Sequence, residues 1–537
     1  MRNKISASAI HQRSALRGFI MNFCFSTFIK VLTATGLIFG ISACFDFNAQ
    51  DSSSSMYSIG GTVSGISTGN SIVLQNNGAD NLHIDANGSF TFNTQLPSYS
   101  SYNITILSFP ADQPCAITYG IGTVISDDIS NAKIVCGPPF VGKFINTSAL
   151  ETQRTGHTAT LLQNGNVLVV GGGGLTTQDY NAAGCRSSAM HVLYSCDYTL
   201  PIYRTVLGSL VYTSIFTISS FLTTEQYNHI NGTWTTSASL NTARSLHTAT
   251  LLPNGKVWVV GGVGSNRGML ASSEIYDPTS DTWTPSANLT EARAGHTATL
   301  LLNGKILVVG GSTGTYPATQ RTSSTELCDI TSNTCSTVGS LSFARSGHTA
   351  TLLPNGKVIV VGGGKGSVGP TSVEIFDPST NEWSVEGDYP STVEGQTATL
   401  LPDGKVLFAG GIPSPASPPV STSILYDSET NTWIPAGNMI TARAFHTATL
   451  LPNGKVLVAG GHTSNPLFPP LSPTITSSAE IFDPLTNAWS LTGEMTTSQT
   501  WQTATLLNTG KLLLVGGAIP PEVTPDVTST AIAQLFW

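Results

Sequence analysis

The chain has 537 residues, only 10 % of them are charged, and its formal net charge at pH 7 is −8. A neutral to acidic surface without a basic stripe argues against nucleic acid as a partner. Low charge and abundant threonine are instead typical of exported β-rich proteins.

The N-terminal segment, residues 1–43, reads as a lipoprotein-type signal peptide. Several basic residues precede the apolar run Val31–Ala43, which is too short to span a bilayer comfortably. The run ends in Ile41-Ser42-Ala43-Cys44, which resembles a bacterial lipobox, and this resemblance predicts lipidation at Cys44. We therefore expect a lipid-anchored protein of the bacterial cell envelope, on a periplasmic or surface face, with residues 44–56 as a tether. An uncleaved anchor, plain secretion and a start at Met21 are the alternatives.

Residues 57–139 predict a small all-β domain, built as a sandwich. Short runs of alternating apolar and polar residues are separated by the turn signals Asn77-Gly78 and Asn87-Gly88. The texture resembles Ig-like modules that precede other domains in bacterial surface proteins, a fold-level likeness that implies no function. The stretch Gly137–Gly142, which contains two prolines, is the expected boundary.

Residues 140–537 repeat one pattern seven times, a period that decides the architecture. Its cleanest copy runs from Arg244 to Gly262 and resumes from Glu274 to Trp283. Successive copies are spaced by 90, 49, 52, 49, 49 and 56 residues. We place the repeat starts at Arg154, Arg244, Arg293, Arg345, Glu394, Arg443 and Gln499.

Each repeat predicts four antiparallel strands, named a to d. In the second repeat, strand a is His247–Leu252 and strand b is Lys256–Gly262, joined by a tight Asn-Gly turn. Strand c is Ser273–Tyr276, and strand d surrounds Trp283. Four such strands cannot bury their own apolar faces, so seven copies predict the stacked blades of a β-propeller.

The spaced marks of the repeat resemble those of the kelch family: a double glycine, an aromatic residue, and a tryptophan after six intervening residues. Here they are Gly261-Gly262, Tyr276 and Trp283, and they recur in register over roughly residues 140–537. The resemblance implies a kelch propeller of six or seven blades, and the repeat count favours seven. We expect the aromatic pair to fill the wedge between neighbouring blades.

The sequence also predicts how the first and last blades of the propeller join to close a ring. The last repeat ends at Trp537 without a fourth strand. Phe144 precedes Arg154 by the same interval as Trp283 precedes Arg293, so Val141–Thr147 is expected to supply strand d of the last blade. This pairing would remove two open sheet edges.

Six cysteines remain after the signal peptide and Cys44, and they fall into three local couples. Closely spaced pairs in an exported chain predict disulfides. In the third couple, the two cysteines replace the aromatic residue and the tryptophan of the repeat, so a bridge between strands c and d is expected; a metal site is the weaker alternative. The predicted bridges are Cys115–Cys136, Cys185–Cys196 and Cys328–Cys335.

The repeated arginine and histidine are interpreted as parts of the blades. We expect each arginine to pair with the glutamate of strand c, and each histidine to bond neighbouring backbone. The fifth repeat, with Glu394 for arginine and Ile424 for glutamate, loses both partners together, as does the seventh, with Gln499 and Gln534. A metal-binding ring of histidines is the alternative.

Function is expected in the irregular connections between strands b and c. They hold 10 to 18 residues in six repeats, whereas residues 173–224 form an insertion of 52 residues in the first. The insertion is rich in tyrosine and includes the apolar stretch 205–221, expected to form an extra hairpin. It either caps the propeller or binds a partner. The candidate binding-face residues are Tyr180, Tyr194, Tyr198 and Tyr203.

The sequence therefore predicts a monomeric, envelope-anchored module that binds a protein or glycan through its b–c loops. A carbohydrate-active enzyme, similar to galactose oxidase or to a kelch-type sialic acid epimerase, is the first alternative. No nucleophile, acid–base or metal constellation stands out, so no catalytic residue, metal or cofactor is predicted. A structural spacer in the envelope is the second alternative.

Overall fold

The computed structural model describes residues 55–110, 113, 115–118, 120–124, 127–137, 142–180, 202–206, 209–315, 319–363, 372–389, 394–413, 417–464, 474–520 and 528–537. All regular secondary structure in these ranges is strand, so the all-β fold class is confirmed. No described segment is a helix long and apolar enough to cross a membrane. The predicted signal peptide, Cys44, Cys185, Cys196, Tyr194 and Tyr198 lie outside the described residues.

The N-terminal domain is a sandwich of two four-stranded sheets, ordered β5-β2-β10-β8 and β4-β3-β7-β9, with the small pair β1-β6. Alternate residues of β3 are buried, because successive side chains of a strand point to opposite faces. Side chains of both sheets, such as Ile59 and Leu74, share one core. Cys115 faces Cys136 across β8 and β10, and the two are joined by a disulfide. The strands are β1 (Met56–Tyr57), β2 (Ile59–Ser64), β3 (Ile72–Asn76), β4 (Asp80–Ile84), β5 (Gly88–Thr91), β6 (Leu96–Pro97), β7 (Ser101–Ser108), β8 (Cys115–Thr118), β9 (Ile121–Thr123) and β10 (Ile129–Cys136).

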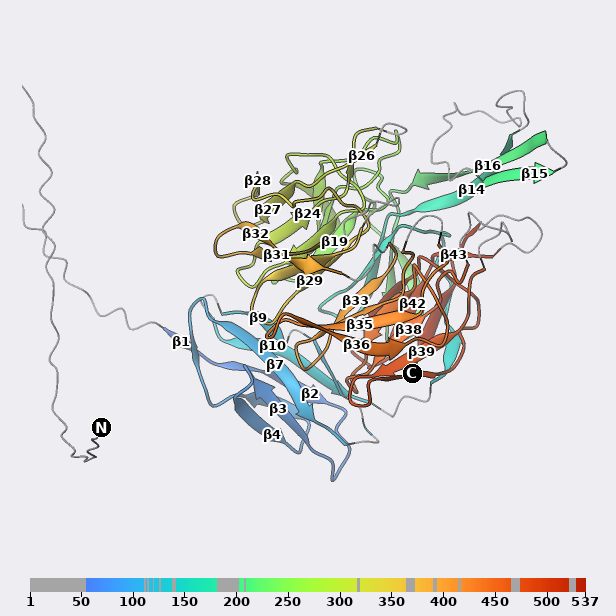
Figure 1. Cartoon of the computed structure of the whole chain (residues 1–537). Coiled ribbons are helices and arrows are strands. Elements are labelled where there is room, and N and C mark those ends of the chain that lie inside the picture. The colour runs from blue at the N-terminus through green and yellow to red at the C-terminus, as the bar shows by residue number, and fades with distance from the viewer. Residues whose placement is uncertain are drawn as a thin grey trace, which may run out of the picture. The chain divides into compact units, whose positions relative to one another are not determined.

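The repeats form seven four-stranded antiparallel sheets (Figure 1). In strand order a to d, the first four blades are β12 (Thr158–Leu161), β13 (Val167–Val170), β17 (Thr224–Asn228) and β18 (Thr233–Ser237); β19 (Thr248–Leu251), β20 (Val257–Val260), β21 (Ser273–Asp277) and β22 (Thr282–Ser286); β23 (Thr297–Leu300), β24 (Ile306–Val309), β27 (Thr325–Asp329) and β28 (Thr334–Thr337); and β29 (Thr349–Leu352), β30 (Val358–Val361), β31 (Ser372–Asp377) and β32 (Glu382–Asp388).

The remaining three blades follow in the same order. They are β33 (Thr397–Leu400), β34 (Val406–Ala409), β35 (Thr422–Asp427) and β36 (Thr432–Asn438); β37 (Thr447–Leu450), β38 (Val456–Ala459), β39 (Ala479–Asp483) and β40 (Ala488–Leu491); and β41 (Thr503–Leu506), β42 (Leu512–Val515), β45 (Ala533–Phe536) and β11 (Phe144–Asn146).

The blades close into a ring. Each a strand neighbours the a strand of the next blade, and β41 of the seventh blade returns to β12 of the first. Every b strand is buried along its length because it lies between strands a and c with a neighbouring blade on each face. The structure is therefore the seven-bladed propeller that the repeats predict.

Closure of the last blade is confirmed. β11 pairs with β45 in antiparallel register, with Phe144 opposite Phe536 and Asn146 opposite Gln534. The rings of Phe144 and Phe536 lie 4.7 Å apart, in the place that Tyr276 and Trp283 occupy in the second blade. A strand from before the first repeat thus completes the last blade.

The aromatic pairs occupy the wedges between blades. Tyr276 and Trp283 lie 5.0 Å apart and pack with Leu168 and Val170 of the preceding blade. The Trp283 indole donates a 2.9 Å hydrogen bond to the carbonyl of Ala238, also of the preceding blade. Four of the pairs therefore join two blades through both their apolar surface and an indole N–H group, which belongs to Trp234, Trp283, Trp383 or Trp489.

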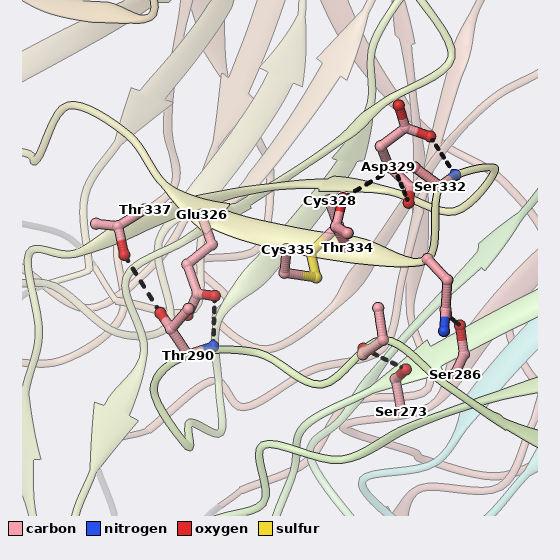
Figure 2. Close-up of a disulfide and its surroundings, with 12 residues drawn as sticks. Ser273, Ser286, Thr290, Glu326, Cys328, Asp329, Ser332, Thr334, Cys335 and Thr337 are labelled. Atoms are coloured by element: carbon pink, nitrogen blue, oxygen red, sulfur yellow. Dashed lines mark hydrogen bonds between the residues drawn. A yellow bond between two sulfur atoms is a disulfide. The ribbon is translucent and has the colours of Figure 1, made fainter.

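The third blade replaces the aromatic pair with a disulfide. Cys328 and Cys335 are opposite each other in β27 and β28 and are bonded, with their Cα atoms 4.1 Å apart (Figure 2). Buried Trp258, from β20 of the second blade, packs in the same cluster as the two cysteines. The other blades have leucine or isoleucine at the position of Trp258.

Candidate binding face

The b–c loops and the d–a connections lie together at one end of the blades. Just before strand a, Ser245 forms a β-bridge with Val263, which follows the double glycine at the end of strand b. The equivalent bridges Thr155–Gly173 and Ala444–His462 repeat this arrangement in other blades. We call this end the loop face, and the opposite end, with its minimal a–b turns such as Pro253–Gly255, the turn face.

The insertion in the first blade forms a sheet on its own. β14 (Gly173–Tyr180) pairs with β16 (Ser209–Ser220), and β15 (Ile202–Val206) pairs with the other edge of β16, so the expected hairpin is present as β15–β16 (Figure 1). Tyr180 and Tyr203 both pair with Thr213, from opposite sides of β16. Two of the four candidate tyrosines therefore lie at the same level of this sheet, one on each strand beside β16. Two shorter pairs lie in other b–c loops: β25 (Ser312–Thr313) with β26 (Gln320–Arg321), and β43 (Ala518–Ile519) with β44 (Thr528–Ser529).

The repeated arginines are structural. Arg244 is completely buried, and its guanidinium lies 2.9 Å from the Glu274 carboxylate and 2.8 Å from the carbonyl of Gly261. Glu274 in turn accepts hydrogen bonds from the backbone N–H groups of Asn241 and Thr242 in the d–a connection. Because a buried charge needs such partners, this set fixes the connection between blades. The predicted pairing is confirmed for Arg154–Glu225, Arg244–Glu274, Arg293–Glu326, Arg345–Glu374 and Arg443–Glu480.

The seventh blade keeps this geometry without charge. Gln534 donates a hydrogen bond to the Gln499 side chain at 2.5 Å, and Gln499 donates to the carbonyl of Gly516 at 2.9 Å. The loss of both charges together agrees with the prediction.

The placement of Glu394 at the arginine position of the fifth blade is wrong. Glu394 forms the β-bridge with Ile412, which is the bridge that Ser245 forms with Val263 in the second blade. Glu394 therefore lies one residue after the arginine position. In the sequence, the arginine position of this repeat is held by Val393. The error arose because the fifth repeat has no arginine to fix its register.

The repeated histidines join neighbouring blades. His247 and Thr158 of the preceding blade share a hydrogen bond of 3.0 Å between Nε2 and Oγ1, so the partner is a threonine hydroxyl and not the backbone that we expected. Burial, with a neighbouring arginine, lowers the pKa of these imidazoles, well below 6.5 for His247 and to about 3 for His157, His296, His348 and His446. They are therefore neutral. The other four bonds join His157 to Thr503, His296 to Thr248, His348 to Thr297 and His446 to Thr397.

The residue before each histidine, or before the glutamine that replaces it, adopts a left-handed conformation and forms a ring around the axis. The N–H of Leu246 donates to the carbonyl of Gly156 in the preceding blade at 2.9 Å, and four further bonds of this kind join other neighbours. In blade order, the ring residues are Gly156, Leu246, Gly295, Gly347, Gly395, Phe445 and Trp501, with φ between 54° and 72°. Glycine is the residue suited to this conformation, so the leucine and the two aromatic residues are exceptions.

A cavity of ≈330 Å³ lies on the ring axis, lined by residues of six blades. Its lining includes the ring residues Leu246, Gly295, Gly347 and Phe445, and four of the five neutral histidines: His157, His247, His296 and His348. Glu394 also lines it, and among the described lining residues it is the only acidic one. The cavity is thus an axial site on the loop face with one carboxylate and two apolar walls.

An aromatic cluster adjoins the ring at the sixth and seventh blades. The rings of His462 and Trp501 lie 4.9 Å apart, and Phe445 lies within 6 Å of both, at 5.7 and 5.8 Å. His462 is 2 % exposed, and neither of its ring nitrogens has a hydrogen-bond partner among the described residues. Burial lowers its pKa to about 4.

Our sequence reasoning missed Glu394, Phe445, His462 and Trp501 as residues of the loop face. It assigned the histidines to the repeat, but His462 follows the double glycine and has no counterpart in other repeats. A signal was present: three repeats have a large residue where four have glycine before the histidine position.

Comparisons with known proteins agree with the repeat pattern. The model for the KLHDC2/KLHL20/DRC7 kelch-repeats domain matches residues 220–411, and the kelch motif model matches residues 443–496. The protein is a kelch-repeat β-propeller. The kelch resemblance expected from the sequence is therefore confirmed.

A solved structure with a TM-score above 0.5 shares this fold at low sequence identity. A fungal alcohol oxidase of the AA5 family, in complex with copper, gives a TM-score of 0.54 at 18 % identity, over 74 % of this chain and 76 % of its own. The structure of YjhT gives 0.43 at 19 % identity, over 54 % and 94 %. Among curated proteins, no sequence matches. In this kelch propeller, the described residues include no group of three His, Cys, Asp or Glu side chains that could hold a metal ion.

Proposed function

We propose that this kelch propeller is a recognition module that binds a glycan or a protein through its loop face. The observation that carries the proposal is the asymmetry between its two ends. The a–b turns are minimal in every blade, whereas the loop face carries the β14–β16 sheet, two shorter strand pairs and the axial cavity. Elaboration on one end of a regular scaffold is the usual location of binding residues.

The β14–β16 sheet is the largest addition to this face, and the candidate tyrosines lie within its insertion. Tyrosine suits recognition because it offers a large contact area with little side-chain entropy to lose. The sheet lies outside the blade pattern: β13 pairs directly with β17 in the first blade, as β20 pairs with β21 in the second.

The experiment is excision of residues 176–217, with a Gly-Ser linker joining Leu175 to Ile218. The blades should keep their melting temperature, whereas binding to a panel of glycans and envelope proteins should be lost. Charge reversal of Lys256 and Lys357 on the turn face is the matched control and should leave binding unchanged. If the excised protein binds as well as the parent protein, the insertion only caps the propeller and does not bind the partner.

The proposal includes attachment to the bacterial cell envelope through a lipid on Cys44. The support is the sequence Ile41-Ser42-Ala43-Cys44 after an apolar run. Several acyl chains hold a protein on a membrane far more firmly than one. Metabolic palmitate labelling should mark the protein and should not mark its Cys44→Ser variant; equal labelling of both would refute lipidation at this position.

A further inference from the structure

The axial cavity is formed by the absence of side chains at part of the ring. Gly295 and Gly347 occupy adjacent ring positions, and both line the cavity. A Cβ atom on Gly347 would lie in ordinary van der Waals contact with the Glu394 carboxylate, at 3.8 Å, so a side chain at this position would occupy space beside that carboxylate. The volume of the cavity, ≈330 Å³, is near the lower limit of about 300 Å³ for sites that bind small molecules. A volume of this size suits one small cyclic unit.

Apolar side chains wall the cavity. The Phe445 ring lies over Gly395, since a Cβ atom there would be 2.9 Å from two of its carbons, and Leu246 lies over Gly156 in the same way, at 3.2 Å. Leu246 is 36 % exposed and Phe445 is partly exposed. Both have a φ near 55°, a conformation that is costly for bulky residues and that is found most often at binding and active sites.

The polar groups of the cavity favour a neutral ligand. Glu394 provides a carboxylate acceptor, and Arg321 of β26 lies close to it. Burial lowers the pKa of the Arg321 guanidinium, and the negative charge of Glu394 partly opposes this by raising the same pKa. The guanidinium offsets the charge of Glu394, which weakens attraction for a cation. A carboxylate accepts hydrogen bonds from several donors at once, so a ligand hydroxyl can share Glu394 with its protein partners. The histidines of the lining are uncharged. Among the described backbones, the ring bond that joins five neighbour pairs is absent between Gly347 and Gly395, as it is between Trp501 and Gly156.

We propose that the cavity binds one neutral sugar unit of a glycan, with the C–H face of the sugar stacked on Phe445 and its hydroxyl groups bonded to Glu394. The proposal rests on the proposed recognition function and selects a glycan over a protein as the ligand. A sugar ring presents an apolar face and donor hydroxyl groups together, which is the combination that an aromatic wall beside a carboxylate recognises.

The test is titration of the purified protein with methyl glycosides of galactose, glucose, mannose and N-acetylglucosamine, followed by saturation-transfer NMR and calorimetry. At least one should bind saturably. Glu394→Gln, which keeps the side-chain shape, and Phe445→Ala should each weaken that binding about tenfold, as loss of a hydrogen bond to a charged group or of a buried aromatic contact implies. Phe343→Ala is the matched control: Phe343 is 53 % exposed, lies in a d–a connection and does not line the cavity.

Three results would overturn the inference. The first is no binding of any of the four glycosides. The second is binding that Glu394→Gln and Phe445→Ala leave unchanged, which would place the sugar elsewhere and leave the proposed recognition function intact. The third is Glu394-dependent binding of a triarginine peptide without sugar binding, which would make the cavity a cation site. Melting temperatures of all variants show whether a loss reflects misfolding.

Discussion

At the scale of single residues, the charged pairs of the blades are stabilising only as complete sets. The Arg244 guanidinium bonds the Glu274 carboxylate and two backbone carbonyls, and no part of it is exposed. Removing one partner would leave the other charge buried, which costs about 3–5 kcal/mol. The glutamine pair of the seventh blade shows that a neutral set fits the same place.

Arg244→Gln alone should therefore lower the free energy of unfolding by about 3 kcal/mol or more, because Glu274 stays buried without its cation. The double variant Arg244→Gln/Glu274→Gln should recover most of that loss. Urea denaturation measures both values. A double variant as unstable as the sum of the two single variants would show that the pair is not interchangeable with the seventh-blade arrangement.

The interblade histidines predict a pH dependence of stability. Their folded pKa values are lowered, to about 3 for His446, whereas an unfolded histidine titrates near 6.5. The unfolded chain therefore takes up more protons below pH 6.5, so stability is complete above that pH and falls as the pH drops towards about 3.

The fifth and seventh blades supply the matched variant. Gln396 and Gln502 stand at the histidine position and donate to the carbonyls of Val361 and Ala459. His446→Gln should reduce the fall of melting temperature between pH 6.5 and pH 4 by the share of one histidine, with His462 and the other interblade histidines supplying the rest. An unchanged slope would mean that His446 does not contribute to the acid sensitivity.

At the scale of elements, the third blade shows how a wedge is refilled. The Cys328–Cys335 bridge is smaller than a tyrosine–tryptophan pair, and Trp258 of the second blade packs against it from the facing strand. Trp258 is fully buried. The two departures from the repeat therefore compensate for each other in volume, as close-packed interiors require.

Trp258→Leu should destabilise the propeller by about 2–4 kcal/mol, because it leaves a cavity beside the disulfide. Adding Cys328→Tyr and Cys335→Trp to Trp258→Leu should restore stability, whereas the same two changes with Trp258 retained should overpack the wedge. Thermal unfolding of the three variants gives the comparison, and non-reducing peptide mapping checks the bridge in the parent. Equal stability with and without Trp258 would refute the compensation.

At the scale of the whole molecule, one strand closes the ring. Phe144–Asn146 pairs with Ala533–Phe536, so the last blade combines two distant parts of the chain. Deleting residues 531–537 should lower the melting temperature of all seven blades in a single transition, since it opens two sheet edges. Loss confined to the seventh blade, seen by hydrogen exchange, would contradict closure as a global constraint.

The sequence was sufficient for the blades and their closure because each repeat carries its own marks, such as Gly261-Gly262 and Trp283. It was insufficient for the axial cavity. Gly295, Gly347, Glu394 and Phe445 come from four repeats, and only ring closure places them around one space. Glu394 was misplaced because its register depends on a bridge to Ile412 and not on a local motif.

The central claim is that recognition takes place on the loop face while the blades serve as scaffold. Hydrogen–deuterium exchange of the whole protein, with and without the first ligand found by the glycan and envelope-protein panels, tests it most directly. We expect added protection in residues 173–220 and around the ring from Gly156 to Trp501, with none in the a–b turns. Protection confined to turns such as Pro253–Gly255, or to the outer d strands, would contradict the claim.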